Sequence, residues 1–199
     1  MGQSLIEIEP VLDLEIPETE WIFFSSPKGA ISYLNHHPLK AKSIAVFGEG
    51  TLKALKKFNV TANFIGNSEH DSITIGQKFN SVIGNNESVL FPISRLSKRN
   101  VIKGFANENY REIITYSTIK KPLTFNVNFD AILFTSPSNF KSFILLNKIN
   151  SSTQIIAMGK TTESTIRKLL PSHEVHSLSE PTEKSLIEFF EKIESQISL

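Results

Sequence analysis

Short apolar runs alternate along the chain with stretches in which apolar side chains recur at helical spacing. Residues 21–24 and 131–134 are runs of four apolar residues, and each is followed by hydroxyl residues and a proline. Such runs are too short for a helix and are typical of strands buried on both faces of a parallel sheet. Each run is followed by apolar residues at helical spacing, which predicts a strand that leads into an amphipathic helix. These residues are Ala30, Ile31 and Leu34 after the first run and Phe140, Phe143 and Ile144 after the second.

The same pattern occurs twice at a nearly constant offset. Pro27 and Pro137, which follow the two runs, are 110 positions apart, and Gly48 and Gly159, which follow the next strands, are 111 apart. Two unrelated matches rarely share an offset, so we infer two similar halves. Each half reads as strand, helix, strand and helix, which implies parallel sheets with helices on both faces. The second helices are marked by Leu52 and Leu55 and by Ile166, Leu169 and Leu170.

Other segments lie outside the repeat. Apolar spacing predicts a helix over 73–83, a strand at 89–91, a helix around 94–106 and an amphipathic C-terminal helix. Residues 5–9 and 112–118 also read as strands, one at the start of the chain and one between the halves. We expect these two to pair as a two-stranded connector.

Composition narrows the class of protein. The 199 residues are 40% hydrophobic and 21% charged, with a net charge of +1 and no cysteine. These values fit one large or two small globular domains without disulfides or thiolate metal sites. The near-neutral charge argues against a large nucleic-acid interface. The chain has no run of about 20 apolar residues and no signal-peptide pattern at its start, so we expect a cytoplasmic protein.

Four polar segments follow the predicted strands and lead into helices. The N-terminus of a helix presents free N–H groups and a positive dipole end, which favour carboxylates or phosphates. If the halves face each other, the segments predict a cleft for a polyanion. Taken singly, a Ser or Thr there is more often only a helix cap, and the basic run 95–99 is more often a solvated face. The segments are Ser25–Lys28, Gly48–Thr51, Thr135–Asn139 and Gly159–Thr162.

Several chemistries are not indicated by the sequence. The histidines at 36, 37, 173 and 176 have no metal-ligand spacing, and Gly48-Glu49-Gly50 is too short for a phosphate-binding loop. No serine-hydrolase elbow is present.

The order of the motifs resembles that of the uroporphyrinogen-III synthase family. The resemblance covers residues 5–190 and rests on Ser25-Ser26-Pro27, Val89-Leu90-Phe91-Pro92, Ile113-Ile114-Thr115-Tyr116-Ser117-Thr118, Thr135-Ser136-Pro137-Ser138 and Met158-Gly159-Lys160-Thr161-Thr162. It implies an α/β fold of two similar parallel-sheet, flavodoxin-like domains joined by a two-stranded β-ladder, with the active site in the cleft between them. It also implies closure of hydroxymethylbilane, a linear tetrapyrrole with eight carboxylates, to uroporphyrinogen III. Water is lost, ring D is inverted, and no cofactor or metal takes part.

The resemblance assigns roles to particular residues. Tyr116 matches a tyrosine that acts as the acid helping the hydroxyl to leave; because a phenol gives up its proton poorly at neutral pH, positioning by a hydrogen bond is the alternative role. Thr51 and Thr162 match threonines facing the cleft. The remaining substrate-binding candidates, from the resemblance and the polar segments, are Ser25, Ser26, Lys28, Arg95, Ser136, Ser138, Asn139, Lys160 and Thr161.

The domain borders follow from the same comparison. Residues 1–12 and 112–121 are the expected ladder strands, and 13–111 and 122–199 are the two α/β domains. Members of the family usually carry a further strand and helix before the ladder, and we expect this unit of the second domain to be missing here. We expect a monomer, or a dimer if the missing unit is replaced by a second copy.

Two alternatives stay open. The first is a non-catalytic protein that binds tetrapyrroles or other anions, which the missing unit favours. The second is an unrelated two-domain α/β protein such as a sugar-binding receptor. For the synthase, the partners expected are hydroxymethylbilane and, transiently, the deaminase that produces it; nucleic acid and membrane are not expected.

Overall fold

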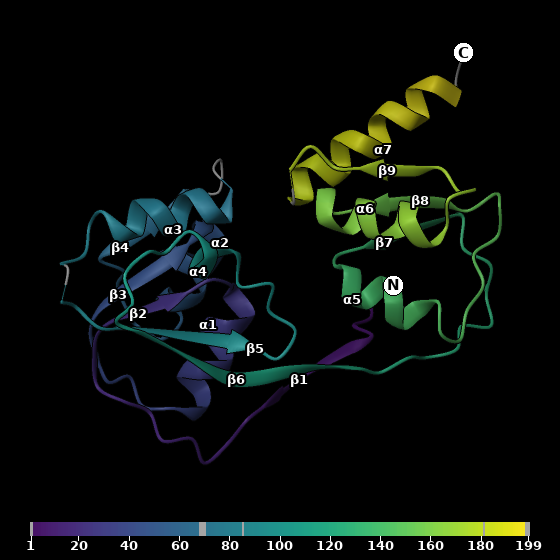
Figure 1. Ribbon diagram of the computed structural model, residues 1–199. Helices are drawn as coiled ribbons and strands as arrows, with labels where there is room; N and C mark the ends of the chain where they lie inside the picture. The colour runs from purple at the N-terminus through teal and green to yellow at the C-terminus, as the bar shows by residue number, and fades with distance from the viewer. Residues whose placement is uncertain (1, 68–70, 85, 181, 198–199) are drawn as a thin grey trace. The chain divides into compact units, whose positions relative to one another are not determined.

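The chain folds into two compact units. The structure, a computed structural model, describes residues 2–67, 71–84, 86–180 and 182–197 (Figure 1). The central unit comprises Ile8–Ile119, and the terminal unit comprises Met1–Glu7 together with Lys120–Leu199.

The central unit is built on a six-stranded sheet in the order β1-β6-β5-β2-β3-β4. Strands β6, β5, β2, β3 and β4 are mutually parallel. The chain runs from β2 to β3 on one side and from β5 to β6 on the other, so the direction of winding reverses between β2 and β5. The strands are β1 (Ile6–Pro10), β2 (Thr19–Phe24), β3 (Ala41–Phe47), β4 (Phe64–Gly66), β5 (Val89–Ser94) and β6 (Tyr110–Lys120).

Strands β1 and β6 form the predicted ladder. The Val11 N–H donates to the Thr115 carbonyl at 2.9 Å, and the Lys121 N–H donates to the Leu5 carbonyl at 2.8 Å. Residue numbers rise along one strand as they fall along the other, so the pair is antiparallel.

Within the described part of the central unit, four helices cover the two faces of the sheet. Alternation along β2 sends Trp21 and Phe23 to one face and Ile22 and Phe24 to the other. The first face packs against α3 and α4 and the second against α1 and α2, which gives three layers (Figure 1). All four side chains of the run 21–24 are buried, as the sequence predicts. The helices are α1 (Pro27–His36), α2 (Gly48–Lys56), α3 (Ser72–Asn80) and α4 (Asn100–Lys103).

The helix predicted around 94–106 is wrong over most of its length. Strand β5 continues to Ser94, and helix is found only in α4. Arg99 has a left-handed backbone with φ 54°, and its N–H donates to the Ser97 hydroxyl at 3.1 Å. A serine that bonds the backbone locally competes with helix formation, so Arg95 and Lys98 lie in a loop.

The terminal unit repeats the pattern on a smaller scale. Its parallel sheet has the order β7-β8-β9, and its core contains Phe134, Phe140, Ile155 and Ile166, with Leu5 from the start of the chain. The strands are β7 (Ala131–Phe134), β8 (Gln154–Ala157) and β9 (Val175–Ser177), and the helices are α5 (Pro137–Phe143), α6 (Lys160–Leu169) and α7 (Glu183–Ile197). The predicted repeat of strand, helix, strand and helix is confirmed, and the short strands β4 and β9 are additional. The domain borders drawn from the sequence stay a prediction.

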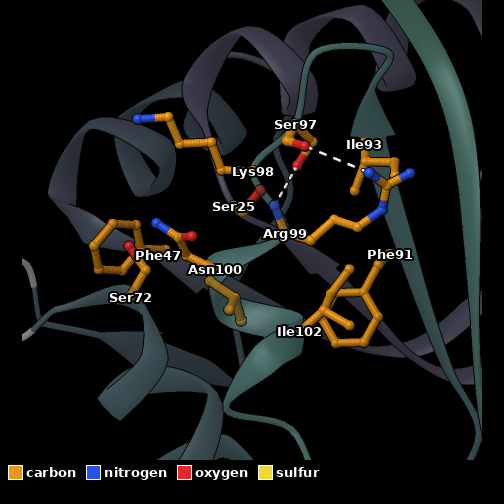
Figure 2. A pocket seen from close by; sticks show the side chains of 11 residues that line it. Ser25, Phe47, Ser72, Phe91, Ile93, Ser97, Lys98, Arg99, Asn100 and Ile102 are labelled. Carbon is orange, nitrogen blue, oxygen red and sulfur yellow. Dashed lines mark hydrogen bonds between the residues drawn. The ribbon is translucent and has the colours of Figure 1, made fainter. Parts of the chain in front are cut away.

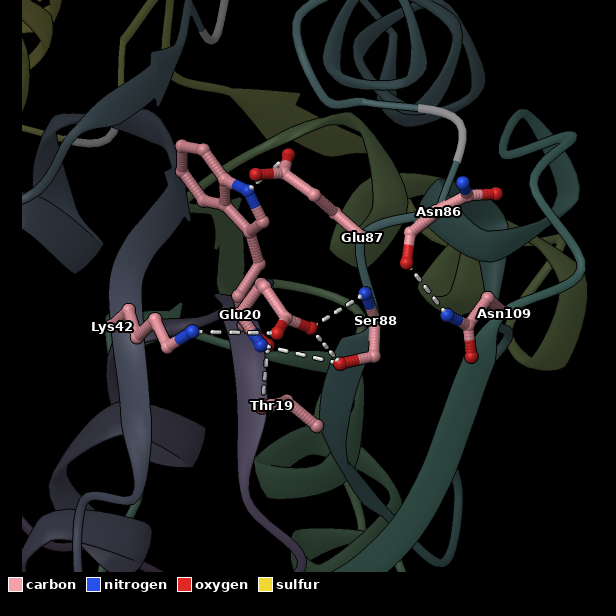
Figure 3. Close-up of polar contacts among 8 residues, drawn as sticks. Thr19, Glu20, Lys42, Asn86, Glu87, Ser88 and Asn109 are labelled. Atoms are coloured by element: carbon pink, nitrogen blue, oxygen red, sulfur yellow. Dashed lines mark hydrogen bonds and ion pairs between the residues drawn. The ribbon is translucent and has the colours of Figure 1, made fainter.

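A polar clamp ties β2 to β5 at their N-terminal ends. The Glu20 carboxylate accepts hydrogen bonds from the backbone N–H of Ser88, at 3.0 Å, and from the Ser88 hydroxyl, and it pairs with Lys42 at 3.6 Å (Figure 3). The hydrogen bonds from Ser88 lower the pKa of Glu20 to about 2. The clamp holds together the N-terminal ends of these two strands, opposite to the C-terminal ends where the candidate site lies.

Candidate functional site

The first part of the site is the turn from β2 into α1. Ser26 is extended at φ −158° and caps the helix, its hydroxyl accepting from the Gly29 N–H at 3.1 Å. Pro27 occupies the first turn, where its missing N–H costs nothing. The segment Ser25–Lys28 therefore forms the cap predicted from its sequence.

Tyr116 is aimed at this cap by an irregularity in the sheet. Ile93 pairs with Ile114 but Ser94 pairs with Tyr116, so Thr115 is an extra residue in β6. Such bulges re-aim neighbouring side chains and often adjoin active sites. The Tyr116 ring is buried, and its hydroxyl lies 3.3 Å from the Ser26 hydroxyl. The structure thus brings together two predicted site residues that are 90 positions apart.

Gly29 makes room for this tyrosine. A Cβ added at Gly29 would lie 3.0 Å from the Ser26 Oγ, 3.4 Å from the Tyr116 Cε1 and 3.5 Å from its hydroxyl. Gly29 is a position of the candidate site that the sequence prediction missed. The available signal is a glycine in the first turn of a helix, where most residues have better helix propensity.

Three further predicted residues lie in this turn or beside Tyr116. The Arg95 N–H donates to the Tyr116 carbonyl at 3.0 Å and its Nε donates to the Ser117 hydroxyl at 3.3 Å, so Arg95, which directly follows β5, lies beside Tyr116 of β6. Lys28 is exposed, and desolvation by nearby groups lowers the pKa of its ammonium. The Ser25 hydroxyl has no hydrogen-bond partner among the described residues.

Thr51 occupies the first turn of α2 and is almost fully buried, with its hydroxyl donating to the Phe47 carbonyl at 2.7 Å. Helix α2 starts at Gly48 with φ 76° and has no side-chain cap. The first N–H groups of the helix therefore remain available for an acceptor from outside the helix.

The equivalent turn in the terminal unit lies between β7 and α5. Ser136 caps the helix by accepting from the Asn139 N–H at 3.2 Å. The Asn139 carboxamide oxygen accepts from the Leu5 N–H at 2.8 Å, and its nitrogen donates to the Thr135 hydroxyl at 3.2 Å. Asn139 thus holds the first residues of the chain against this unit. Ser138 is half-buried between these residues.

Helix α6 resembles α2 at its start. Gly159 precedes it with extended backbone and no side-chain cap, Lys160 and Thr161 are exposed, and Thr162 is buried. In each unit the predicted helix-start residues therefore follow the C-terminal ends of parallel strands, where ligands of open α/β sheets bind. Among the described residues no three His, Asp or Glu side chains gather as a metal site.

Comparison with known proteins identifies the family. Residues 3–188 match the family model described as uroporphyrinogen-III synthase HemD. The chain belongs to the uroporphyrinogen-III synthase family. The resemblance drawn from the sequence is thereby confirmed, since the match covers nearly the whole chain.

A relative in sequence agrees with membership of the uroporphyrinogen-III synthase family. A candidate uroporphyrinogen-III synthase of Methanocaldococcus jannaschii is 31% identical over 102 residues, which cover 48% of this chain and 42% of that relative. The aligned segment therefore spans less than half of the relative's length.

Solved structures share the fold. The crystal structure of uroporphyrinogen-III synthetase from Helicobacter pylori matches 95% of this chain and 91% of its own, with a TM-score of 0.71 and 17% identity. A mutant uroporphyrinogen III synthase from the extremely thermophilic bacterium Thermus thermophilus matches 96% and 88%, with a TM-score of 0.55 and 12% identity. The two-domain α/β fold predicted from the sequence is thus confirmed. In the described part of the chain, no helix is long and apolar enough to cross a bilayer.

Proposed function

We propose that this protein is a uroporphyrinogen-III synthase, which converts hydroxymethylbilane to uroporphyrinogen III with inversion of ring D and loss of one water. The observation that carries the proposal is the family match over residues 3–188. The contact of Tyr116 with the capped start of α1 supports the choice of reacting site, because it joins a buried phenol to a helix N-terminus at the carboxyl edge of the sheet.

Tyr116 acts on the hydroxyl that leaves as water. The Gly29 N–H occupies one acceptor position on the Ser26 hydroxyl, so Ser26 can donate its own proton to the Tyr116 oxygen. The phenol O–H is then directed at the substrate hydroxyl. Transfer of the phenol proton along this bond lets the hydroxyl depart as water and leaves a cationic methylene carbon. Ring D attacks this carbon with its π electrons, and a proton released as the macrocycle forms restores the phenol. No oxidant or reductant is consumed.

The remaining residues hold the substrate. Spontaneous closure of hydroxymethylbilane gives the symmetric isomer, so the enzyme's task is to fix one conformation of the chain. We assign the uncapped starts of α2 and α6, with Thr51, Lys160, Thr161 and Thr162, to substrate carboxylates. We assign further contacts with the substrate to Ser136, Ser138 and Asn139 of the terminal unit and to Ser25, Lys28 and Arg95 of the central unit.

A coupled assay tests the function. Porphobilinogen and its deaminase generate hydroxymethylbilane in the presence of the protein, and the oxidised isomers are separated by chromatography. An excess of type III over type I supports the synthase. Type I alone contradicts it and favours a non-catalytic binder of tetrapyrroles.

The setting of the enzyme follows from the substrate. Hydroxymethylbilane closes spontaneously, so direct transfer from the deaminase would limit loss to the wrong isomer. We propose a monomer that works in the cytoplasm, without a bound cofactor, and contacts the deaminase transiently. A sedimentation experiment with and without the deaminase tests this contact.

A further inference from the structure

A cavity of about 160 Å³ opens at the carboxyl ends of β2, β3 and β5, on the face of the sheet that carries α3 and α4 (Figure 2). It lies where the winding of the central sheet reverses, between β2 and β5, which is the position at which open α/β sheets bind ligands. Its volume is below the roughly 300 Å³ of the smallest sites for drug-sized molecules. The cavity therefore suits a small group and not a ring system.

The cavity is apolar at its base and polar around it. Phe91, Ile93 and Ile102 are buried side chains of the wall. Ser25, Ser72 and Asn100 also line it, and none of their side chains has a hydrogen-bond partner among the described residues. An apolar wall with unpaired donors fits a carboxylate on a short methylene arm, since the methylenes contact the rings and the oxygens accept from the donors.

The charged residues of the cavity favour an anion. Lys98 and Arg99 line it and no carboxylate does. The Arg99 guanidinium is bound to Glu112 at 2.5 Å, and Figure 2 shows its side chain extending toward the Ile93 side, while Asn100 extends toward the Phe47 side. Lys98 has no ion pair within the described ranges. Lys98 is therefore the cation that remains free to meet an incoming carboxylate.

We propose that this cavity is the subsite for one carboxylate arm of the tetrapyrrole, with Asn100 and Ser25 donating to the carboxylate and Lys98 supplying the opposite charge. The inference rests on the proposed function, because it needs a substrate that carries carboxylates on methylene arms. It adds Lys98, Asn100 and Ser72 to the site. It also separates anchoring from chemistry, since Tyr116 packs against α1 while the cavity lies on the α3 and α4 face.

The test is the double variant Lys98→Met/Asn100→Leu in the coupled assay. Both changes preserve side-chain length or shape at exposed positions, so folding should be kept. The control is Lys103→Met, which removes an exposed positive charge from α4 outside the cavity. We expect the double variant to raise KM about tenfold with kcat within about twofold of the wild type, the size of a lost hydrogen bond to a charged group. The control should leave KM unchanged.

A KM within about twofold of the wild type would overturn the inference while leaving the synthase proposal intact. If the double variant loses its circular dichroism signal, Ser25→Ala replaces it as the test at the opposite wall, with the same expected direction. A wild-type protein that makes no type III isomer would reject the proposed function instead.

In that case titration with the oxidised porphyrin octacarboxylate decides the inference. Tenfold weaker binding by the double variant supports the subsite, and equal binding or no binding to the wild type rejects it. A porphyrin in which the carboxymethyl arms are methyl groups identifies the arm. If the difference in affinity between wild type and double variant disappears with this porphyrin, the cavity binds a carboxymethyl arm. If the difference persists, the cavity binds a carboxyethyl arm.

Discussion

The turns before α1 and α5 have the same sequence pattern and different uses. Ser26 and Ser136 cap their helices with nearly equal geometry, at 3.1 and 3.2 Å, and a proline follows each. The third helical residue differs. It is Gly29 in the central unit, where the Tyr116 ring takes the space, and Asn139 in the terminal unit, where the carboxamide binds Leu5.

This difference shows how a repeated unit acquires separate roles. The cap is needed in both copies because each helix has orphan N–H groups. The third helical position is free to vary, because its side chain points away from the hydrogen bonds of the helix. One copy therefore admits the Tyr116 ring, and the other binds the start of the chain through Leu5.

The largest effect should come from Tyr116→Phe, which removes the hydroxyl from the central turn and keeps the ring. We expect kcat for the type III isomer to fall about 100-fold, the lower range for loss of a group that assists proton transfer. The coupled assay measures it. Tyr110→Phe on the same strand is the control and should leave kcat unchanged. A Tyr116→Phe enzyme with the wild-type rate would remove Tyr116 from the proposed mechanism.

Gly29→Ala should crowd the turn before α1, where the equivalent position of the terminal unit already carries the side chain of Asn139. The added methyl would lie 3.0 Å from Ser26 Oγ and 3.4 Å from the Tyr116 ring, so the phenol must shift. We expect kcat to fall about tenfold through misplacement of the hydroxyl. Stability should not fall, because alanine favours helix by up to about 1 kcal/mol over glycine. Parallel loss of activity and stability would instead mean general disruption.

Asn139→Ala tests the terminal turn. It leaves the Leu5 N–H without its acceptor beside a buried core side chain. We expect a loss of about 1–3 kcal/mol in the free energy of unfolding, measured with urea. Asn128→Ala is matched to it, because Asn128 accepts one exposed hydrogen bond from Asn150, and should cost under about 0.5 kcal/mol. Equal losses in the two variants would show that Asn139 does not fasten the chain.

The smallest expected effect is a pH dependence of stability that differs between the two units, at the N-terminal ends of β2 and β7. Glu20 has a pKa lowered to about 2 by Ser88, whereas Asp130, at the equivalent place before β7, has no side-chain partner among the described residues. The pKa of Glu20 is lower in the folded state than its value of about 4.5 in the unfolded state, so the carboxylate stabilises the fold above about pH 4.5. This stabilisation is lost as the pH falls toward 2.

Glu20→Gln should therefore lower stability at about pH 6 and differ little from the wild type near pH 2. Urea unfolding at several pH values measures the change, with Asp130→Asn as the matched carboxyl-to-amide control in the terminal unit. A Glu20→Gln deficit that stays constant over this whole range of pH would contradict the role of the clamp.

The sequence by itself determined the repeat, the strand and helix order of each half, and the family. Runs such as 21–24 are buried on both faces, and a serine followed by a proline and then by apolar helical spacing indicates a capped helix start. These features are local, because each depends on interactions between residues that are neighbours in the sequence. Local reading failed at 94–106, because apolar spacing favours a helix there while the serine bonds and the left-handed Arg99 stop it.

Only the tertiary structure decided which distant residues meet. The bulge at Thr115 aims Tyr116 at Ser26 and Gly29, and no local pattern specifies a register shift between two strands that far apart. The cavity beside Asn100 likewise collects residues from five segments of the central unit. Contacts of this kind depend on packing between elements, so the sequence named Tyr116 and Ser26 without showing that they are neighbours, and it missed Gly29 and Asn100.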